Sequence, residues 1–150
     1  MDGSSCEFAL SNATPEEIGT ILASTRTVAV VGLSDKPDRE SFIVARYLQA
    51  HGFHIIPINP AVREVLGETS YPDLASVPAG VEIDVVDIFR RPEFIPEIVE
   101  AAIARGARVV WMQLGLAHNG AADRARAAGL QVVMDRCIKV EHARLAAAGR

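Results

Sequence analysis

The chain has 150 residues, of which 49% are hydrophobic, and a formal net charge of −4. This length and composition are typical of one folded domain with its own core, and they argue against a disordered chain. The acidic balance disfavours nucleic acid as a partner, and no apolar run approaches the roughly 18 residues that span a bilayer.

The first segment, residues 1–13, is small and polar, and we expect it to be flexible ahead of a single domain over residues 14–150. Thr14 begins a capping-box pattern in which Pro15 suits the first helical position, so a helix is predicted to about Ser24. The following β-branched run, residues 27–31, is continuously apolar, as in a strand buried on both faces of a parallel sheet.

The middle of the chain alternates between helical and strand patterns. Residues 41–51 have apolar side chains at helical spacing, and residues 53–58 form an apolar run that predicts the second strand. Residues 61–79 have no clear pattern, although 71–74 suggest a turn or a short helix. The third strand is predicted over 81–89.

The last third of the chain continues the alternation. A helix is predicted over 92–105, a strand over 108–112, a helix over 121–128, a strand over 131–134 and a final helix over 138–145. Strands that alternate with helices favour right-handed crossovers and a parallel sheet. We therefore predict an α/β fold, a Rossmann-like three-layer architecture with a five-stranded parallel sheet.

Cations recur where the predicted strands end. In an open parallel sheet, ligands bind beyond the carboxyl ends of the strands, near the point where the strand order reverses. The cations in or just after these exits are Lys36, Arg39, Arg63, Arg90, Arg91 and Arg136. A single arginine is more often a solvated surface residue, but this recurrence favours an anion-binding edge on an acidic protein.

The first two strand exits indicate which anion is favoured. Gly32 is the one residue of the glycine-rich dinucleotide fingerprint that is present, because Ser34 stands where a second glycine would allow close approach of a pyrophosphate. The second strand ends in Asn59 and Pro60 rather than in the acidic residue that holds the ribose of NAD. This pattern favours a phosphorylated ribose, as in NADP or coenzyme A.

Several separate motifs resemble the small CoA-binding domain family, which is similar to the CoA-binding domain of the succinyl-CoA synthetase α subunit. The motifs occur in order over roughly residues 27–142: VAVVGLS (28–34), PDR (37–39), INP (58–60), DIFRR (87–91), WMQLG (111–115) and VMDRC (133–137). The resemblance implies that residues 14–150 are one CoA-binding domain that binds coenzyme A or acyl-CoA as a small-molecule ligand, with no evident catalysis.

The resemblance assigns one group of residues to the phosphates. Gly32, Ser34 and Lys36 would lie against the diphosphate or the ribose phosphate. Arg39 and Ser41 would hold phosphate at the start of the second helix, where backbone amides and the helix dipole favour an anion.

A second group would contact the two ends of the ligand. Asn59 and Pro60 would border the adenosine end. The residues expected along the diphosphate and the pantetheine arm are Phe89, Arg90, Arg91, Gln113 and Gly115.

No residue stands out as catalytic, and the cysteines and histidines lack metal-binding spacing. Cys137 lies beside Arg136 and could form a reversible disulfide with the thiol of coenzyme A, but a small buried residue that packs the last helix is the favoured interpretation. Asp87 is expected to position a loop, and Trp111 to lie in the core. Two cysteines far apart in sequence favour a reduced, cytoplasmic protein, and a homodimer stays open.

Two other functions are compatible with the sequence. An NADP-dependent reductase would need a substrate pocket and a proton donor, neither of which the sequence identifies. A nucleotide-sensing interaction module would need an exposed apolar patch that changes when the ligand binds. A ligase is not expected, because the chain lacks the ligase domain and the phosphohistidine segment of the synthetase.

Overall fold

A five-stranded parallel sheet forms the centre of the computed structural model, which describes residues 7–149. Its strand order is β2-β1-β5-β6-β7. The strands are β1 (Thr27–Val31), β2 (His54–Ile58), β5 (Val85–Ile88), β6 (Val109–Met112) and β7 (Gln131–Val133). The predicted Rossmann-like α/β fold with a five-stranded parallel sheet is confirmed.

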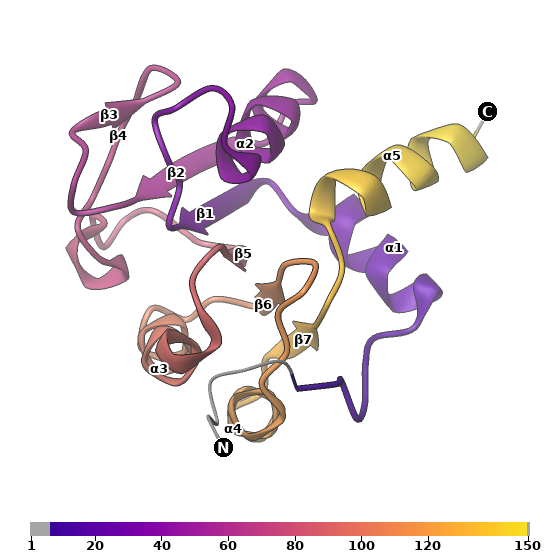
Figure 1. Ribbon diagram of the computed structural model, residues 1–150. Coiled ribbons are helices and arrows are strands. Elements are labelled where there is room, and N and C mark those ends of the chain that lie inside the picture. The colour runs from indigo at the N-terminus through magenta and orange to yellow at the C-terminus, as the bar shows by residue number, and fades with distance from the viewer. Residues whose placement is uncertain (1–6, 150) are drawn as a thin grey trace.

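Helices cover both faces of this sheet (Figure 1). One face packs against α1 (Pro15–Ser24), α2 (Glu40–Ala50) and α5 (Ile138–Ala148), and the other packs against α3 (Ile95–Ala104) and α4 (Asn119–Ala127). No helix within residues 7–149 is long and apolar enough to cross a membrane. The three layers explain the continuous apolar runs in the sequence, because each central strand buries both of its faces.

The N-terminal boundary of the first helix follows the predicted capping box. The Thr14 hydroxyl accepts a hydrogen bond from the Glu17 amide at 3.1 Å, and the Glu17 carboxylate accepts one from the Thr14 amide at 2.8 Å. Residues 1–6 of the expected flexible segment lie outside the described residues. Within residues 7–13, Asn12 bonds both the amide and the carbonyl of Met134, just beyond β7.

A short hairpin lies in the region that the sequence left unassigned. Its strands are β3 (Glu64–Val65) and β4 (Glu68–Thr69), and the two residues between them, Leu66 and Gly67, have φ of 54° and 78°. Two-residue hairpins favour this backbone, usually with Asn-Gly or Asp-Gly. Leu66 stands at the first turn position, where asparagine or aspartate is usual, so the sequence does not indicate a hairpin. A 3-10 turn at Leu74–Ser76 agrees with the turn or short helix expected nearby.

The third strand is shorter than predicted. It spans Val85–Ile88 rather than 81–89, and the side chain of Asp84, just before it, bonds to the start of the neighbouring strand. The Asp84 carboxylate accepts hydrogen bonds from the Arg26 and Thr27 amides at 2.9 and 3.0 Å, at the start of β1. The helix predicted from residue 92 also begins with a 3-10 turn, Pro92–Phe94, before α3.

Two helices of the same layer, α2 and α5, are joined by polar and aromatic contacts. The Tyr47 hydroxyl lies 2.8 Å from His142 Nδ1, and the His142 ring lies edge to face with the rings of Tyr47 and His51, at 5.6 and 5.5 Å between centroids. Burial, with a smaller contribution from His51, lowers the pKa of His142. A neutral His142 suits this position, and the contact fixes α5 beside α2.

Asp87 is fully buried in the central strand β5, between Val30 and Trp111 in the strand register. Neither of its carboxylate oxygens has a hydrogen-bond partner among the described residues. The expectation that Asp87 positions a loop is therefore wrong. Burial raises the pKa of this carboxyl well above its ordinary value, because the charged form is poorly solvated there.

We expect Asp87→Asn to stabilise the protein more at about pH 8 than at about pH 5. A raised native pKa means that the stability Asp87 provides is complete below the unfolded pKa of about 3.9 and is lost as the pH rises through the native pKa. Asparagine removes this loss. Thermal unfolding of both proteins at the two pH values measures the effect, and an equal shift in Tm at both would contradict it.

Candidate ligand-binding site

The strand order reverses between β1 and β5. From β1 the chain continues to β2 on one side, whereas β5, on the other side of β1, is followed by β6 and β7 farther out. The connections that leave β1 and β5 therefore diverge and open a crevice beyond their carboxyl ends, which is where ligands bind in such sheets.

Gly32, the residue that follows β1, lies at the base of this crevice. Its φ is +90°, and its amide donates a hydrogen bond to the Ile58 carbonyl at 2.8 Å. A Cβ at this position would lie 2.4 Å from the Phe89 carbonyl oxygen. Only glycine fits both the backbone conformation and the space, so the ends of β1, β2 and β5 meet closely here.

The loop between β1 and α2 is shaped by its own side chains and by β2. The Ser41 hydroxyl accepts from the Ser34 amide at 3.0 Å, and the Ser34 hydroxyl accepts from the Lys36 amide at 3.1 Å. Asn59 donates from Nδ2 to the Leu33 carbonyl at 2.9 Å. Three predicted ligand-contacting residues, Ser34, Ser41 and Asn59, therefore also hold the loop in shape.

The start of α2 carries no side-chain cap. Arg39 occupies the N-cap position with an extended backbone and makes no capping hydrogen bond. The first amides of a helix have no partner within the helix, and they carry the positive end of its dipole. This end of α2 is therefore suited to an anion.

Several cations surround this helix start and the neighbouring exits. Arg91 pairs with Glu93 at 3.3 Å. Four others are exposed and form no ion pair with an acidic side chain within residues 7–149: Lys36, Arg39, Arg63 and Arg136. Charges left without partners at one edge are available to an anionic ligand.

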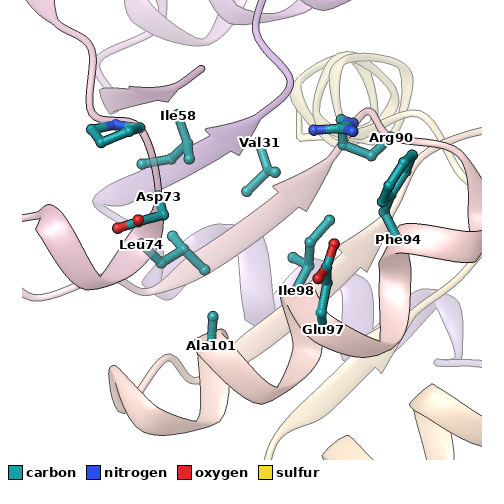
Figure 2. Close-up of a pocket in the computed structure, with 10 residues that line it drawn as sticks. Val31, Ile58, Asp73, Leu74, Arg90, Phe94, Glu97, Ile98 and Ala101 are labelled. Carbon is teal, nitrogen blue, oxygen red and sulfur yellow. The ribbon is translucent and has the colours of Figure 1, made fainter. Parts of the chain in front are cut away.

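Arg90 lies between two cavities and lines both. Its guanidinium carbon sits 4.2 Å from the centroid of the Phe94 ring, and Figure 2 shows the two side chains next to each other at one end of the first cavity. Its Cδ lies 3.0 Å from the position that a Cβ on Gly32 would occupy. Stacking on Phe94 holds the Arg90 guanidinium near the point between β1 and β5 where the strand order reverses.

The first cavity has a volume of about 310 Å³ and lies between the sheet and α3 (Figure 2). Apolar side chains form much of its wall: Val31, Ile58, Leu74, Phe94, Ile98 and Ala101. Asp73 and Glu97 add two carboxylates. A flat group with polar edges suits such a space, because the wall offers apolar contact and a few acceptors.

The second cavity has a volume of about 440 Å³ and lies beyond β5 and β6, between the starts of α2 and α5. Its wall includes Phe89, Leu114, Leu116, Gln113 and Cys137. Leu114 is 70% exposed at this cavity. An apolar chain with few polar groups suits this space.

Gln113 is the best-defined polar group of the second cavity. The residue is 3% exposed, and its Oε1 accepts a hydrogen bond from the Ile138 amide at 3.0 Å. That bond fixes which end of the amide is oxygen, because a backbone amide can only donate. Nε2 has no hydrogen-bond partner among the described residues, so its two N–H groups are left for a ligand.

The structure brings only part of the predicted set to the cavity walls. Four predicted residues line a cavity: Phe89, Arg90, Arg91 and Gln113. Gly32, Lys36 and Arg39 lie at the β1 exit and its loop, whereas Pro60 and Gly115 are exposed and line neither cavity.

Sequence reasoning missed other wall residues. Phe94 stands close to a predicted position in the chain, and it could have been found as an apolar neighbour of Arg90. Leu114, within the stretch 113–115 predicted to lie along the pantetheine arm, does line the second cavity. Cys137 is buried, as expected, and also lines the second cavity. No group of three metal-binding side chains occurs in the described part of the chain.

Comparison with known proteins agrees with this architecture. Residues 26–143 match the CoA binding domain family. The chain belongs to this family. The uncharacterized protein YneT of Bacillus subtilis strain 168 is 40% identical over 134 residues, which cover 89% of this chain and 98% of YneT.

Solved structures of similar proteins share the fold of this CoA-binding domain. A hypothetical protein from Pyrococcus horikoshii OT3 has 40% identity and a TM-score of 0.86, and the match covers 95% of this chain and 99% of the Pyrococcus chain. A Thermus thermophilus protein, cell-free ID.343, has 32% identity and a TM-score of 0.83, and the match covers 89% of this chain and 99% of the Thermus chain.

We expect Gly32→Ala to destabilise the CoA-binding domain by about 2–5 kcal/mol, from backbone strain and the close contact with Phe89. Gly52→Ala is the matched control. Gly52 has nearly the same φ, +91°, but no atom within 4 Å of an added Cβ, so only about 1–2 kcal/mol of strain is expected. Urea unfolding of the three proteins measures both values, and equal losses would show that the close approach contributes nothing.

Proposed function

We propose that this domain binds coenzyme A or acyl-CoA at the carboxyl edge of the sheet and performs no catalysis of its own. The observation that carries the proposal is the meeting of two largely apolar cavities at Arg90, beside the uncapped start of α2. Such a site suits a long ligand that is anionic in the middle and less polar at both ends.

Coenzyme A has this distribution of charge. Its diphosphate would lie between Arg90 and the first turn of α2, because Arg90 and Glu40, the first residue of α2, both line the second cavity. The adenosine would occupy the first cavity, and the pantetheine arm would enter the second. The exposed cations Lys36, Arg39 and Arg63 are available for the phosphate on the ribose.

The proposal also covers the cellular location, the oligomeric state and the absence of catalysis. A cytoplasmic location is favoured by the use of cysteine, since oxidising compartments favour disulfides. The proposed site needs no second copy of the chain, because one chain supplies both cavities. Binding without catalysis is favoured because the second cavity, which would hold the reactive end of the ligand, has a mostly apolar wall.

Calorimetric titration of the ligand-free protein with coenzyme A, dephospho-CoA, NADP and NAD tests the proposal. We expect coenzyme A to bind most tightly and dephospho-CoA more weakly, because the exposed cations would lose the ribose phosphate. Preference for NADP would instead support a reductase. Binding of none of the four would favour the interaction module.

We expect Arg90→Ala to raise the Kd for coenzyme A by about 10- to 150-fold, since a charged hydrogen-bonding group contributes about 1.5–3 kcal/mol. Arg39→Ala should also weaken binding. Arg108→Ala is the matched control, because it removes the same charge at the opposite edge, where Arg108 pairs with Asp84 at 3.7 Å. Calorimetry measures all four proteins. Unchanged affinity in both site variants would place the phosphates elsewhere.

A further inference from the structure

Cys137 places a thiol in the wall of the second cavity. It occupies the N-cap position of α5, is 8% exposed and lies in the same wall as Phe89 and Gln113. It forms no disulfide in the structure. A buried cysteine alone would be a packing residue, and its contacts with the core are consistent with that role.

Gln113 gives an independent reason to expect a ligand in this cavity. The residue is 97% buried, and its Nε2 has no hydrogen-bond partner among the described residues. Nε2 is not one of the fully buried atoms that lack a partner, so it is open to the cavity, where a ligand can accept a hydrogen bond from it. A carbonyl oxygen on the ligand would do so. The pantetheine arm contains amide carbonyls and ends in a thiol.

We propose that Cys137 captures the thiol end of the bound ligand as a reversible mixed disulfide. This inference rests on the proposed function, because the arm must first enter the second cavity. Arg90 lines both cavities, so a diphosphate held there leaves the arm to extend along Gln113 toward Cys137. The thiol of the protein and the sulfur of the ligand then share one cavity.

The reaction is thiol–disulfide exchange with coenzyme A disulfide, which supplies the oxidised sulfur. Cys137 gives its proton to solvent, and the thiolate attacks the nearer sulfur of the ligand. A bond forms between Cys137 Sγ and that sulfur while the ligand's own S–S bond breaks. The electron pair leaves with the second coenzyme A as a thiolate, which takes a proton from solvent. No net oxidation occurs, and reduced thiols reverse the step.

The experiment uses the full chain carrying Cys6→Ser, so that Cys137 is the only thiol. The protein is incubated with coenzyme A disulfide and analysed by intact mass and by peptide mapping. We expect one coenzyme A per chain, located on Cys137 and released by a reductant. The Cys6→Ser, Cys137→Ala protein should gain none, and its circular dichroism checks that it folds.

Two comparisons test whether the binding site directs this exchange. Oxidised glutathione has the same reacting bond but lacks the adenosine and the diphosphate, so it should react more than about tenfold more slowly. Gln113→Glu keeps the acceptor for the Ile138 amide and removes the donor, and it should slow the reaction with coenzyme A disulfide. Equal rates for the two disulfides would mean a merely accessible thiol and would overturn the inference.

Calorimetry with reduced coenzyme A on the same Cys6→Ser protein separates this inference from the proposed function. Binding of reduced coenzyme A without an adduct from the disulfide overturns the capture step alone. No binding of reduced coenzyme A, with glutathione and coenzyme A disulfides reacting alike, overturns both. Binding together with a selective adduct on Cys137 supports both.

Discussion

The close approach of the β1 exit to the backbone of Phe89 is the constraint on which the site depends. Gly32 bonds to β2 through the Ile58 carbonyl and leaves no room for a side chain against Phe89, so three strand ends converge at one point. The loops that leave this point must diverge. Arg90 follows Phe89 directly and lines both cavities, so the two cavities share one cation beside these strand ends.

Helix starts form the second boundary of the site, and each is tied to a strand exit by a different bond. At α2, Ser41 accepts from the Ser34 amide, which binds the helix to the loop after β1. At α5, the Ile138 amide donates to Gln113 after β6. The Tyr47–His142 contact then joins the two helices away from the cavities. Few of these bonds are regular secondary structure, yet together they fix the shape of the opening.

The layers of the fold could be predicted from sequence because they depend on local patterns. Continuous apolar runs give strands that are buried on both faces, and Thr14 with Glu17 marks the first helix. The hairpin at Leu66 could not be predicted, because leucine stands where such turns usually carry asparagine or aspartate, and Gly67 alone is a weak signal. Similarly, the side chain of Gln113 is useful to a ligand only once Ile138, distant in sequence, has engaged its oxygen. Cavities arise from such distant pairs.

The indole of Trp111 has a consequence for how this molecule can be observed. It is the only tryptophan in the chain, it is fully buried, and its Nε1 donates to the Arg136 carbonyl at 2.8 Å, immediately before Cys137. Its fluorescence therefore reports on the segment that leads into α5. Emission should be blue-shifted while this segment is in place. A spectral change without loss of circular dichroism would mark a local rearrangement beside the second cavity, which gives the protein an intrinsic optical probe.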